Sequence, residues 1–320
     1  MAVNVLHYSH QGRSAWGVVS QGAITPIPGD YPTTEVFVKQ ALGLALSLPP
    51  APALLESEVT LLAPVTRNQQ FICLGANYRQ HSMESGIDPD AKRFNMVFTK
   101  AASSICAANA DVVRPDVVKF LDYEIELGLV LKRDIGAACR IEDADLPDYI
   151  AALTIVNDYS ARDIQIPQSQ FYKGKSFRTF GPVGPYLCVL APEDFAQLGG
   201  LRLTLKVNGQ VRQQDLTGHM IYGPAETLSE LSTIHDLAAG DLISTGTPAG
   251  CALSLPTPAR QRLSAFVCES TRWKRFLQQQ ARRPQYLRIG DVVEATIVSE
   301  DGSLDLGVQT NRIVAQAPGA

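Results

Sequence analysis

Short apolar segments separated by turns that contain Gly and Pro dominate this sequence from residue 71 onward, and few helical segments interrupt them. Segments rich in Val, Ile, Leu, Phe and Tyr are typical of β-strands. Strands that do not alternate with helices argue against a βαβ fold and favour rolled sheets. We therefore predict a mainly β (α+β) chain. The segments are 71–78, 96–100, 121–132, 152–158, 201–210, 241–246 and 291–298.

The first 66 residues follow a different pattern. Residues 15–30 predict a β-hairpin with a Gly turn, and residues 33–48 predict a helix that a Thr caps at its start. We predict a small N-terminal α/β domain over 1–66 and a larger catalytic domain over 67–320. Within the larger domain, the Asn208-Gly209 pair predicts a tight hairpin turn.

One segment breaks the run of strands. Residues 258–283 predict a helix with an apolar face, and eight Lys or Arg but only one acid, Glu269, lie between Arg260 and Arg288. We expect a basic amphipathic helix between two strands. Its apolar residues are Leu263, Phe266, Val267, Trp273, Phe276 and Leu277.

Composition narrows the classes of function. A net charge of −4 and a pI near 5.8 give no indication of a nucleic-acid or anionic-membrane partner. The N-terminus lacks the pattern of a signal peptide, and no apolar run approaches the roughly 20 residues that span a bilayer. The six cysteines are scattered without a CxxC pair, which favours a reduced, cytoplasmic protein.

The segment 120–131, FLDYEIELGLVL, sets two glutamates into an apolar strand. Glu124 and Glu126 are two residues apart, so their side chains are expected on one face. A divalent cation offsets the cost of placing two carboxylates together, and oxygen ligands suit Mg²⁺, Mn²⁺ or Ca²⁺. Asp158, directly after the strand 152–157, is a candidate third ligand. The alternative is that both glutamates lie on a solvated sheet face.

Three further segments carry candidate chemistry. His81 and Glu84 are three residues apart, so one helical turn would place them on one face, where the carboxylate raises the basicity of the imidazole. Lys175 follows Gly174 and is a candidate to stabilise an oxyanion. The turn 244–250, STGTPAG, could bind an anion through backbone N–H groups. The alternatives are a surface His–Glu pair and a solvated lysine.

The order of these segments is more specific than any one of them. LGANYRQH, DYEIELGLV, VNDYSARDIQ, KGKSFRTFGPVGP, VNGQVRQ, LSTIHDLAAGDLISTGTPAG and LRIGDVVEATI follow one another as in the fumarylacetoacetate hydrolase family. The resemblance covers about residues 70–315 and is to bacterial members of the acylpyruvase type. It implies a β-roll catalytic domain, one bound metal that is usually Mg²⁺, and a homodimer.

The resemblance also implies roles for individual residues. Glu124, Glu126 and Asp158 match the metal ligands of the family. His81 and Glu84 match its water-activating dyad. Family substrates are 2-oxo acids with a second carbonyl, which the metal holds by the carboxylate and the 2-oxo oxygen. Hydroxide attacks the distal carbonyl, and the C–C bond breaks toward an enolate that the cation stabilises.

The remaining matches concern the substrate. Lys175 corresponds to the lysine beside the developing oxyanion, and Tyr78, Arg162, Gln165 and Thr247 correspond to substrate-binding positions. The implied activity is hydrolysis of a carbon–carbon bond in an acylpyruvate or other diketo acid, with a role in aromatic-compound catabolism. A decarboxylase or tautomerase of oxaloacetate, or a hydroxymuconate isomerase, is the alternative on the same scaffold.

This chain departs from the family pattern at three places. Leu74 stands where larger eukaryotic relatives place a fourth metal carboxylate. Arg178 replaces an Asp of many bacterial members, and we hypothesise that it meets a distal carboxylate of a fumarylpyruvate- or maleylpyruvate-like substrate; pairing with a neighbouring acid is the alternative. An insertion of about 36 residues, 251–286, is either a lid over the pocket or a helix at a dimer interface.

Overall fold

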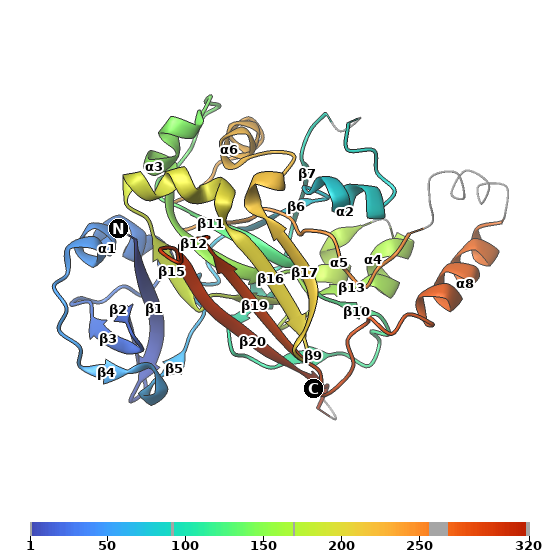
Figure 1. Cartoon of the computed structure of the whole chain (residues 1–320), viewed down its shortest axis with the longest axis horizontal. Helices are drawn as coiled ribbons and strands as arrows, with labels where there is room; N and C mark the ends of the chain where they lie inside the picture. Colours follow the sequence, from blue (N-terminus) through green and yellow to red (C-terminus); the bar gives the residue numbers. More distant parts are fainter. Residues whose placement is uncertain (1, 91–92, 169, 256–267, 318–320) are drawn as a thin grey trace.

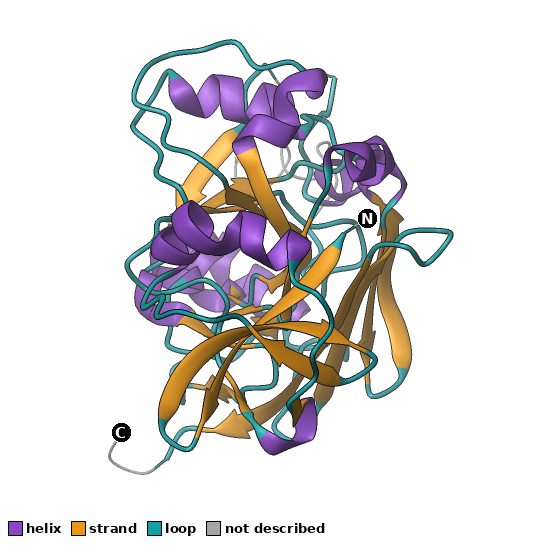
Figure 2. Cartoon of the chain, turned by 90° about the vertical axis from the view of Figure 1, so that its left-hand side faces the viewer, coloured by secondary structure: helices purple, strands orange, loops and turns teal. Residues whose placement is uncertain are grey.

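A computed structural model describes residues 2–90, 93–168, 170–255 and 268–317. Strands dominate it, and they curve as they cross the molecule (Figures 1 and 2), which confirms the predicted mainly β fold. No helix among these residues is long and apolar enough to cross a membrane.

The described residues form one large sheet of thirteen strands, in which the N-terminal strands continue the catalytic ones. β1 pairs antiparallel with β15, with Val3 opposite Val189 and Leu6 opposite Tyr186. The boundary between residues 66 and 67 therefore crosses a shared sheet, and the division into two domains stays a prediction. The strands are β1 (Val3–His10), β2 (Arg13–Ser20), β3 (Ala23–Pro26), β4 (Leu54–Leu55), β5 (Thr60–Leu61), β6 (Phe71–Gly75), β7 (Met96–Thr99), β8 (Ile105–Ala107), β11 (Ile125–Leu131), β12 (Ile150–Asn157), β14 (Gly181–Val183), β15 (Tyr186–Val189) and β18 (Leu242–Ser244).

A second sheet of five strands crosses in front of the large one in the view of Figure 1. Its strands run in the order β17 (Gln210–Leu216), β16 (Arg202–Val207), β19 (Val292–Val298), β20 (Asp305–Ala315) and β9 (Val112–Arg114). The predicted turn between β16 and β17 is confirmed. Asn208 and Gly209 have φ values of 50° and 78°, the left-handed backbone that a two-residue hairpin turn requires.

Helices occupy the ends and margins of the sheets. α1 (Thr34–Ser47) is confirmed with its cap, because the Thr33 side chain accepts the N–H of Val36 at 3.2 Å. The others are α2 (Arg79–Glu84), α3 (Leu146–Tyr149), α4 (Arg162–Gln168), α5 (Phe171–Lys175), α6 (Pro224–Ser232) and α8 (Glu269–Gln280).

α8 confirms the predicted insertion helix over residues 269–280, whereas 256–267 lie outside the described residues. Phe276 is buried as expected, but Leu277 is 36% exposed. The C-terminal end of the helix is tied to the body of the protein, because Gln280 Nε2 donates to Ser254 O at 2.9 Å and Tyr286 donates to Gln280 Oε1 at 2.8 Å.

The predicted continuous strand over 120–131 is wrong in one respect. It is divided into β10 (Leu121–Asp122), which pairs with β13 (Ser160–Ala161), and β11. At the break, side chains replace backbone partners: the N–H of Tyr123 donates to Asp122 Oδ1, and the N–H of Glu124 donates to Asn157 Oδ1, both at 2.9 Å. The interruption places Glu124 immediately before the first residue of β11.

Candidate active site

Three buried carboxylates meet where β11 and β12 lie side by side. Glu124 immediately precedes β11, Glu126 is its second residue, and Asp158 follows β12. The strands pair antiparallel with Ile125 opposite Asn157, so these chain positions are adjacent. One oxygen from each carboxylate lies within 4.8 Å of the others. The expected convergence is therefore present, whereas the role of these residues as metal ligands stays a prediction.

Lysine side chains hold two of these carboxylates in place. Lys175 Nζ donates to Glu124 Oε2 at 2.6 Å and also pairs with Asp158 Oδ2. Lys100, directly after β7, pairs with Asp158 Oδ1 and donates to the carbonyl of Phe180 at 2.8 Å. Burial favours the uncharged lysine, but Asp158 and Glu124 outweigh it and raise the pKa of Lys175.

Arg162 provides the third cation of the cluster. Its Nε donates to Asp122 Oδ2 at 2.8 Å, one terminal nitrogen pairs with Glu124, and the other donates to Gln165 Oε1 at 2.8 Å. Burial opposes ionisation of Glu124, but Arg162 and Lys175 outweigh it and hold its pKa well below the usual value.

Glu126 forms no ion pair within the described part of the chain. It accepts from Ser244 Oγ at 2.5 Å and from the N–H of Gly246 at 2.9 Å. Burial, followed by the charges of Asp158 and Glu124, raises its pKa to about 8. Three converging carboxylates, one of which has no ion pair among the described residues, fit a divalent cation with oxygen ligands.

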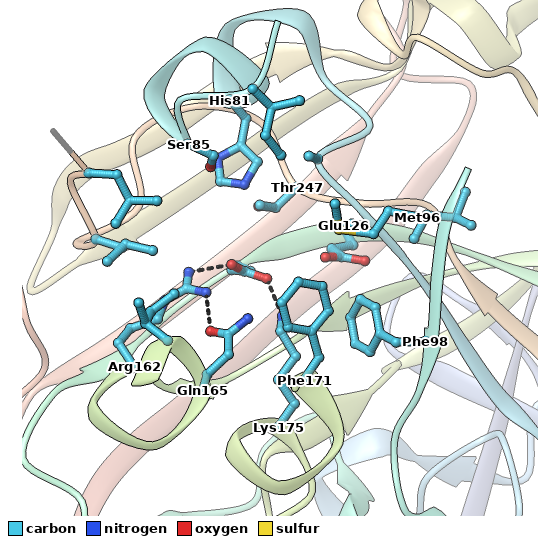
Figure 3. A pocket seen from close by; sticks show the side chains of 18 residues that line it. His81, Ser85, Met96, Phe98, Glu126, Arg162, Gln165, Phe171, Lys175 and Thr247 are labelled. Carbon is cyan, nitrogen blue, oxygen red and sulfur yellow. Dashed lines mark hydrogen bonds and ion pairs between the residues drawn. The ribbon is translucent and has the colours of Figure 1, made fainter. Parts of the chain in front are cut away.

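His81 faces these groups across a cavity of about 180 Å³. Figure 3 shows His81 on one side, and Arg162, Gln165 and Lys175 on the opposite side. Burial is the main reason that the pKa of His81 falls to about 4, so the imidazole is neutral at neutral pH. A neutral imidazole can accept a proton.

No hydrogen bond or ion pair joins Glu84 to His81 among the described residues. Glu84 is exposed, and its Oε2 accepts the N–H of Gly250 at 3.1 Å, whereas His81 Nδ1 lies 3.9 Å from Cys251 Sγ. The predicted dyad is therefore not formed in this structure. Catalytic hydrogen bonds often tighten only when substrate is bound, so the dyad stays a prediction.

Comparison with known proteins decides the family. A model described as "Fumarylacetoacetate (FAA) hydrolase C-terminal" matches residues 70–314. The chain belongs to the fumarylacetoacetate hydrolase family.

Individual members of the family match this chain over different lengths. Oxaloacetate tautomerase YisK of Bacillus subtilis is 37% identical over 205 residues, which cover 63% of this chain and 66% of that protein. The fumarylacetoacetate hydrolase of Exiguobacterium antarcticum is 27% identical, with a TM-score of 0.71 over 98% of this chain and 100% of the other. A 2-hydroxyhepta-2,4-diene-1,7-dioate isomerase of Mycobacterium marinum, 23% identical with a TM-score of 0.70 over 98% and 99%, shares the fold.

In this fumarylacetoacetate hydrolase family member, the predicted substrate-binding residues lie in different places. Arg162, Gln165 and Thr247 line the cavity, and Thr247 Oγ1 donates to Ile125 O at 2.9 Å. Tyr78 is fully buried outside the cavity lining, with its hydroxyl unpartnered. Arg178 is exposed and also outside the lining. The substrate roles of Tyr78 and Arg178 stay predictions that this placement does not support.

Sequence reasoning missed several residues of this family member's site. Lys100 directly follows a short strand, where a lysine is usually solvated. A buried carboxylate such as Asp158 needs a partner, but the sequence did not show that Lys100 is that partner. Asp122 lies within the same apolar segment as the two glutamates and orients Arg162. Cys251 forms a second group of possible ligands with His81 and Glu124, but its thiol suits softer ions than the three carboxylates do.

Proposed function

We propose that this chain is a metal-dependent hydrolase that cleaves a C–C bond of an acylpyruvate-type diketo acid, such as a fumarylpyruvate- or maleylpyruvate-like compound. The supporting observation is that three buried carboxylates converge beside Lys175, and that two of them, Glu124 and Glu126, line a cavity that His81 faces from the other side. In such a site, enolate stabilisation and water activation are tasks of different groups: the carboxylate cluster and Lys175 serve the first, and His81 serves the second.

Glu124, Glu126 and Asp158 are the residues that would hold the cation, for which Mg²⁺ is our first choice and Mn²⁺ or Ca²⁺ the alternatives. When bound, a divalent cation supplies Lewis-acid stabilisation of negative charge on a 2-oxo acid and its enolate. The charge of the cluster supports this assignment, because Glu126 lacks a cationic partner among the described residues while Glu124 and Asp158 have theirs.

The chain's own residues then perform the steps of hydrolysis. Arg162 and Gln165, which are hydrogen-bonded to each other, bind and orient the keto acid. His81 accepts a proton from water as the oxygen attacks the distal carbonyl carbon. The C–C bond breaks, its electron pair forms the enolate, and the ammonium of Lys175 stabilises the developing negative charge. Protonation of the enolate carbon yields pyruvate beside the released acid.

A tautomerase or isomerase is the second candidate, because Glu84 binds Gly250 and no other carboxylate of the described residues is hydrogen-bonded to His81. The similarity to an oxaloacetate tautomerase supports the same candidate function. Tautomerisation needs enolate stabilisation but no attack by water. Oxaloacetate decarboxylation and hydroxymuconate isomerisation share that requirement.

One assay distinguishes these reactions. The protein is incubated with Mg²⁺ and a panel of acylpyruvates and oxaloacetate in ¹⁸O-labelled water, and the products are identified by mass. Hydrolysis places one ¹⁸O in the released acid, decarboxylation releases CO₂, and tautomerisation only accelerates the approach to keto–enol equilibrium, which NMR spectra follow. Turnover of oxaloacetate without hydrolysis of any acylpyruvate would establish the second candidate.

We also propose that the protein is a homodimer, which light scattering after size-exclusion chromatography would test. A role in aromatic-compound catabolism and a cytoplasmic location remain predictions.

A further inference from the structure

A second cavity, of about 500 Å³, adjoins the candidate active site. Leu253 and Leu255 line both cavities. Cys251 also lines the second one, and its Sγ lies 4.0 Å from Glu124 Oε1. The second cavity therefore begins one side chain away from the carboxylate cluster. We call it the arginine cleft, after Arg212 and Arg283 in its wall.

Both arginines of the cleft lack an acidic partner within the described part of the chain. Arg212, on β17, has its Nε buried and without a hydrogen bond. Arg283, which follows α8, donates from Nε to the carbonyl of Ala252 at 2.7 Å, and this bond fixes the direction of its guanidinium. A buried N–H without a partner is costly, so the cleft is suited to a ligand that accepts hydrogen bonds.

Tyr123 lines the same cleft as the two arginines, and its hydroxyl donates to Gly250 O at 3.3 Å. Among the described residues that line the cleft, the acid is the exposed Glu84, which accepts the N–H of Gly250. Two cations against one carboxylate leave a positive charge.

We propose that the arginine cleft binds the distal carboxylate of the fumarylpyruvate- or maleylpyruvate-like substrate, so that Arg212 and Arg283 are specificity-determining residues. This inference rests on the proposed function, because it assumes that the keto-acid end occupies the carboxylate cluster. The active-site cavity of about 180 Å³ is below the roughly 300–1,000 Å³ of typical ligand pockets, so a longer substrate extends past Cys251. Guanidinium groups match carboxylates in charge and geometry.

The same inference gives the insertion a function. Arg283, Leu253 and Leu255 all belong to the segment 251–286, so the insertion supplies part of the wall that selects the distal group. It also assigns to Arg212 and Arg283 the role that the sequence had suggested for Arg178.

The test compares a fumarylpyruvate-type diketo acid with the methyl ester of its distal carboxylate. Arg212→Gln and Arg283→Gln are each expected to lower kcat/KM for the free acid about tenfold or more, and to lower it much less for the ester. Arg282→Gln is the matched control, because Arg282 is an exposed neighbour outside the cleft lining and its loss changes the net charge equally. Arg283→Lys, which keeps the charge, is expected to recover part of the loss.

Equal losses on acid and ester, or no loss on either, would overturn the proposal. If the Gln variants do not fold, as judged by thermal unfolding, the wild-type protein still tests it. The inhibition constants of 2-oxoadipate and 2-oxopimelate should then be at least about tenfold lower than those of their distal monoesters. Equal inhibition constants would contradict the proposal.

Calorimetry separates this proposal from the proposed function. If no keto acid is turned over, binding of 2-oxoadipate is measured directly with Mg²⁺ present. Binding that the Gln variants weaken but Arg282→Gln does not would retain the cleft while the reaction is rejected. Binding that is equal in all variants would reject the cleft.

Discussion

The ammonium group of Lys100 pairs with Asp158 Oδ1, while Lys175 takes the other oxygen of the same carboxylate. Both Lys100 and Asp158 are fully buried, and Lys100 also donates to the carbonyls of Tyr159 and Phe180. Lys100, directly after β7, therefore fixes Asp158 from a different segment without lining the cavity. It is a positioning residue for the carboxylate cluster.

Replacement of Lys100 by Met is expected to lower the free energy of unfolding by about 3–5 kcal/mol, because it leaves a buried carboxylate with one partner fewer. Metal affinity should fall about 10–100-fold, the usual effect of removing a group that orients a ligand. Denaturant unfolding and calorimetric titration with Mg²⁺ measure the two effects. Lys173→Met, at an exposed position of α5, is the control. Unchanged metal affinity in a folded Lys100→Met protein would contradict the positioning role.

Removal of the metal is expected to abolish turnover and to lower the thermal stability. A cation at about 100 times its Kd stabilises the folded state by about 2.7 kcal/mol. Glu126→Gln should remove most of the Mg²⁺-dependent shift in Tm, since Glu126 is one of the three proposed ligands. Glu300→Gln, an exposed change of equal charge, should keep the shift. Full activity after exhaustive treatment with a chelator would contradict the proposed mechanism.

His81→Asn is expected to separate hydrolysis from tautomerisation. Loss of a general base typically lowers a rate about 10²–10⁴-fold, so incorporation of ¹⁸O should fall by this amount. Metal binding should persist, because His81 is not among the three proposed ligands. The control is the same substitution at the exposed His219. If His81→Asn left hydrolysis unchanged, another residue would have to activate water.

The buried His7 predicts a loss of stability in mild acid. Its ring stacks on Trp16 with 4.3 Å between centroids, and burial lowers its pKa in the folded protein. The folded state therefore binds fewer protons than the unfolded state, where the pKa is about 6.5. The contribution of His7 to stability is complete above pH 6.5 and is lost as the pH falls through the folded pKa.

Denaturant unfolding between pH 7.5 and 5 measures this effect. His7→Phe keeps the stacked ring and should make the decline in stability with falling pH shallower than in the wild type. The same substitution at the partly exposed His235 should leave the slope unchanged. A slope that is identical in wild type and His7→Phe would show that His7 does not contribute.

Several local features were predictable because their causes are local. The Thr33 cap, the Asn208-Gly209 turn and the helix 269–280 each depend on residues within a few positions of one another. Glu124 and Glu126 were recognisable as a pair because strand geometry fixes two residues at that spacing on one face. Asp158 was a candidate third ligand because it directly follows an apolar strand, and the family resemblance implied the same role.

Other features depend on partners far away in the chain. Lys100 acquires its role from a residue 58 positions later, and Glu84 binds the backbone of Gly250, 166 positions later, in place of its expected neighbour His81. The break at Tyr123 depends on Asn157, whose side chain replaces a strand partner. No local pattern encodes these pairings.

The sequence alone determined the strand-rich fold, the family and the chemical type of the site, because residue type and spacing dictate strands, turns and oxygen ligands. The tertiary structure decided how the buried charges are shared: which cation neutralises which carboxylate, that Arg178 lies outside the cavity, and that Arg212 and Arg283 meet in one cleft. These outcomes depend on distances between segments that only the packed sheets bring together. Charge pairing in a buried site follows from those distances and not from proximity in sequence.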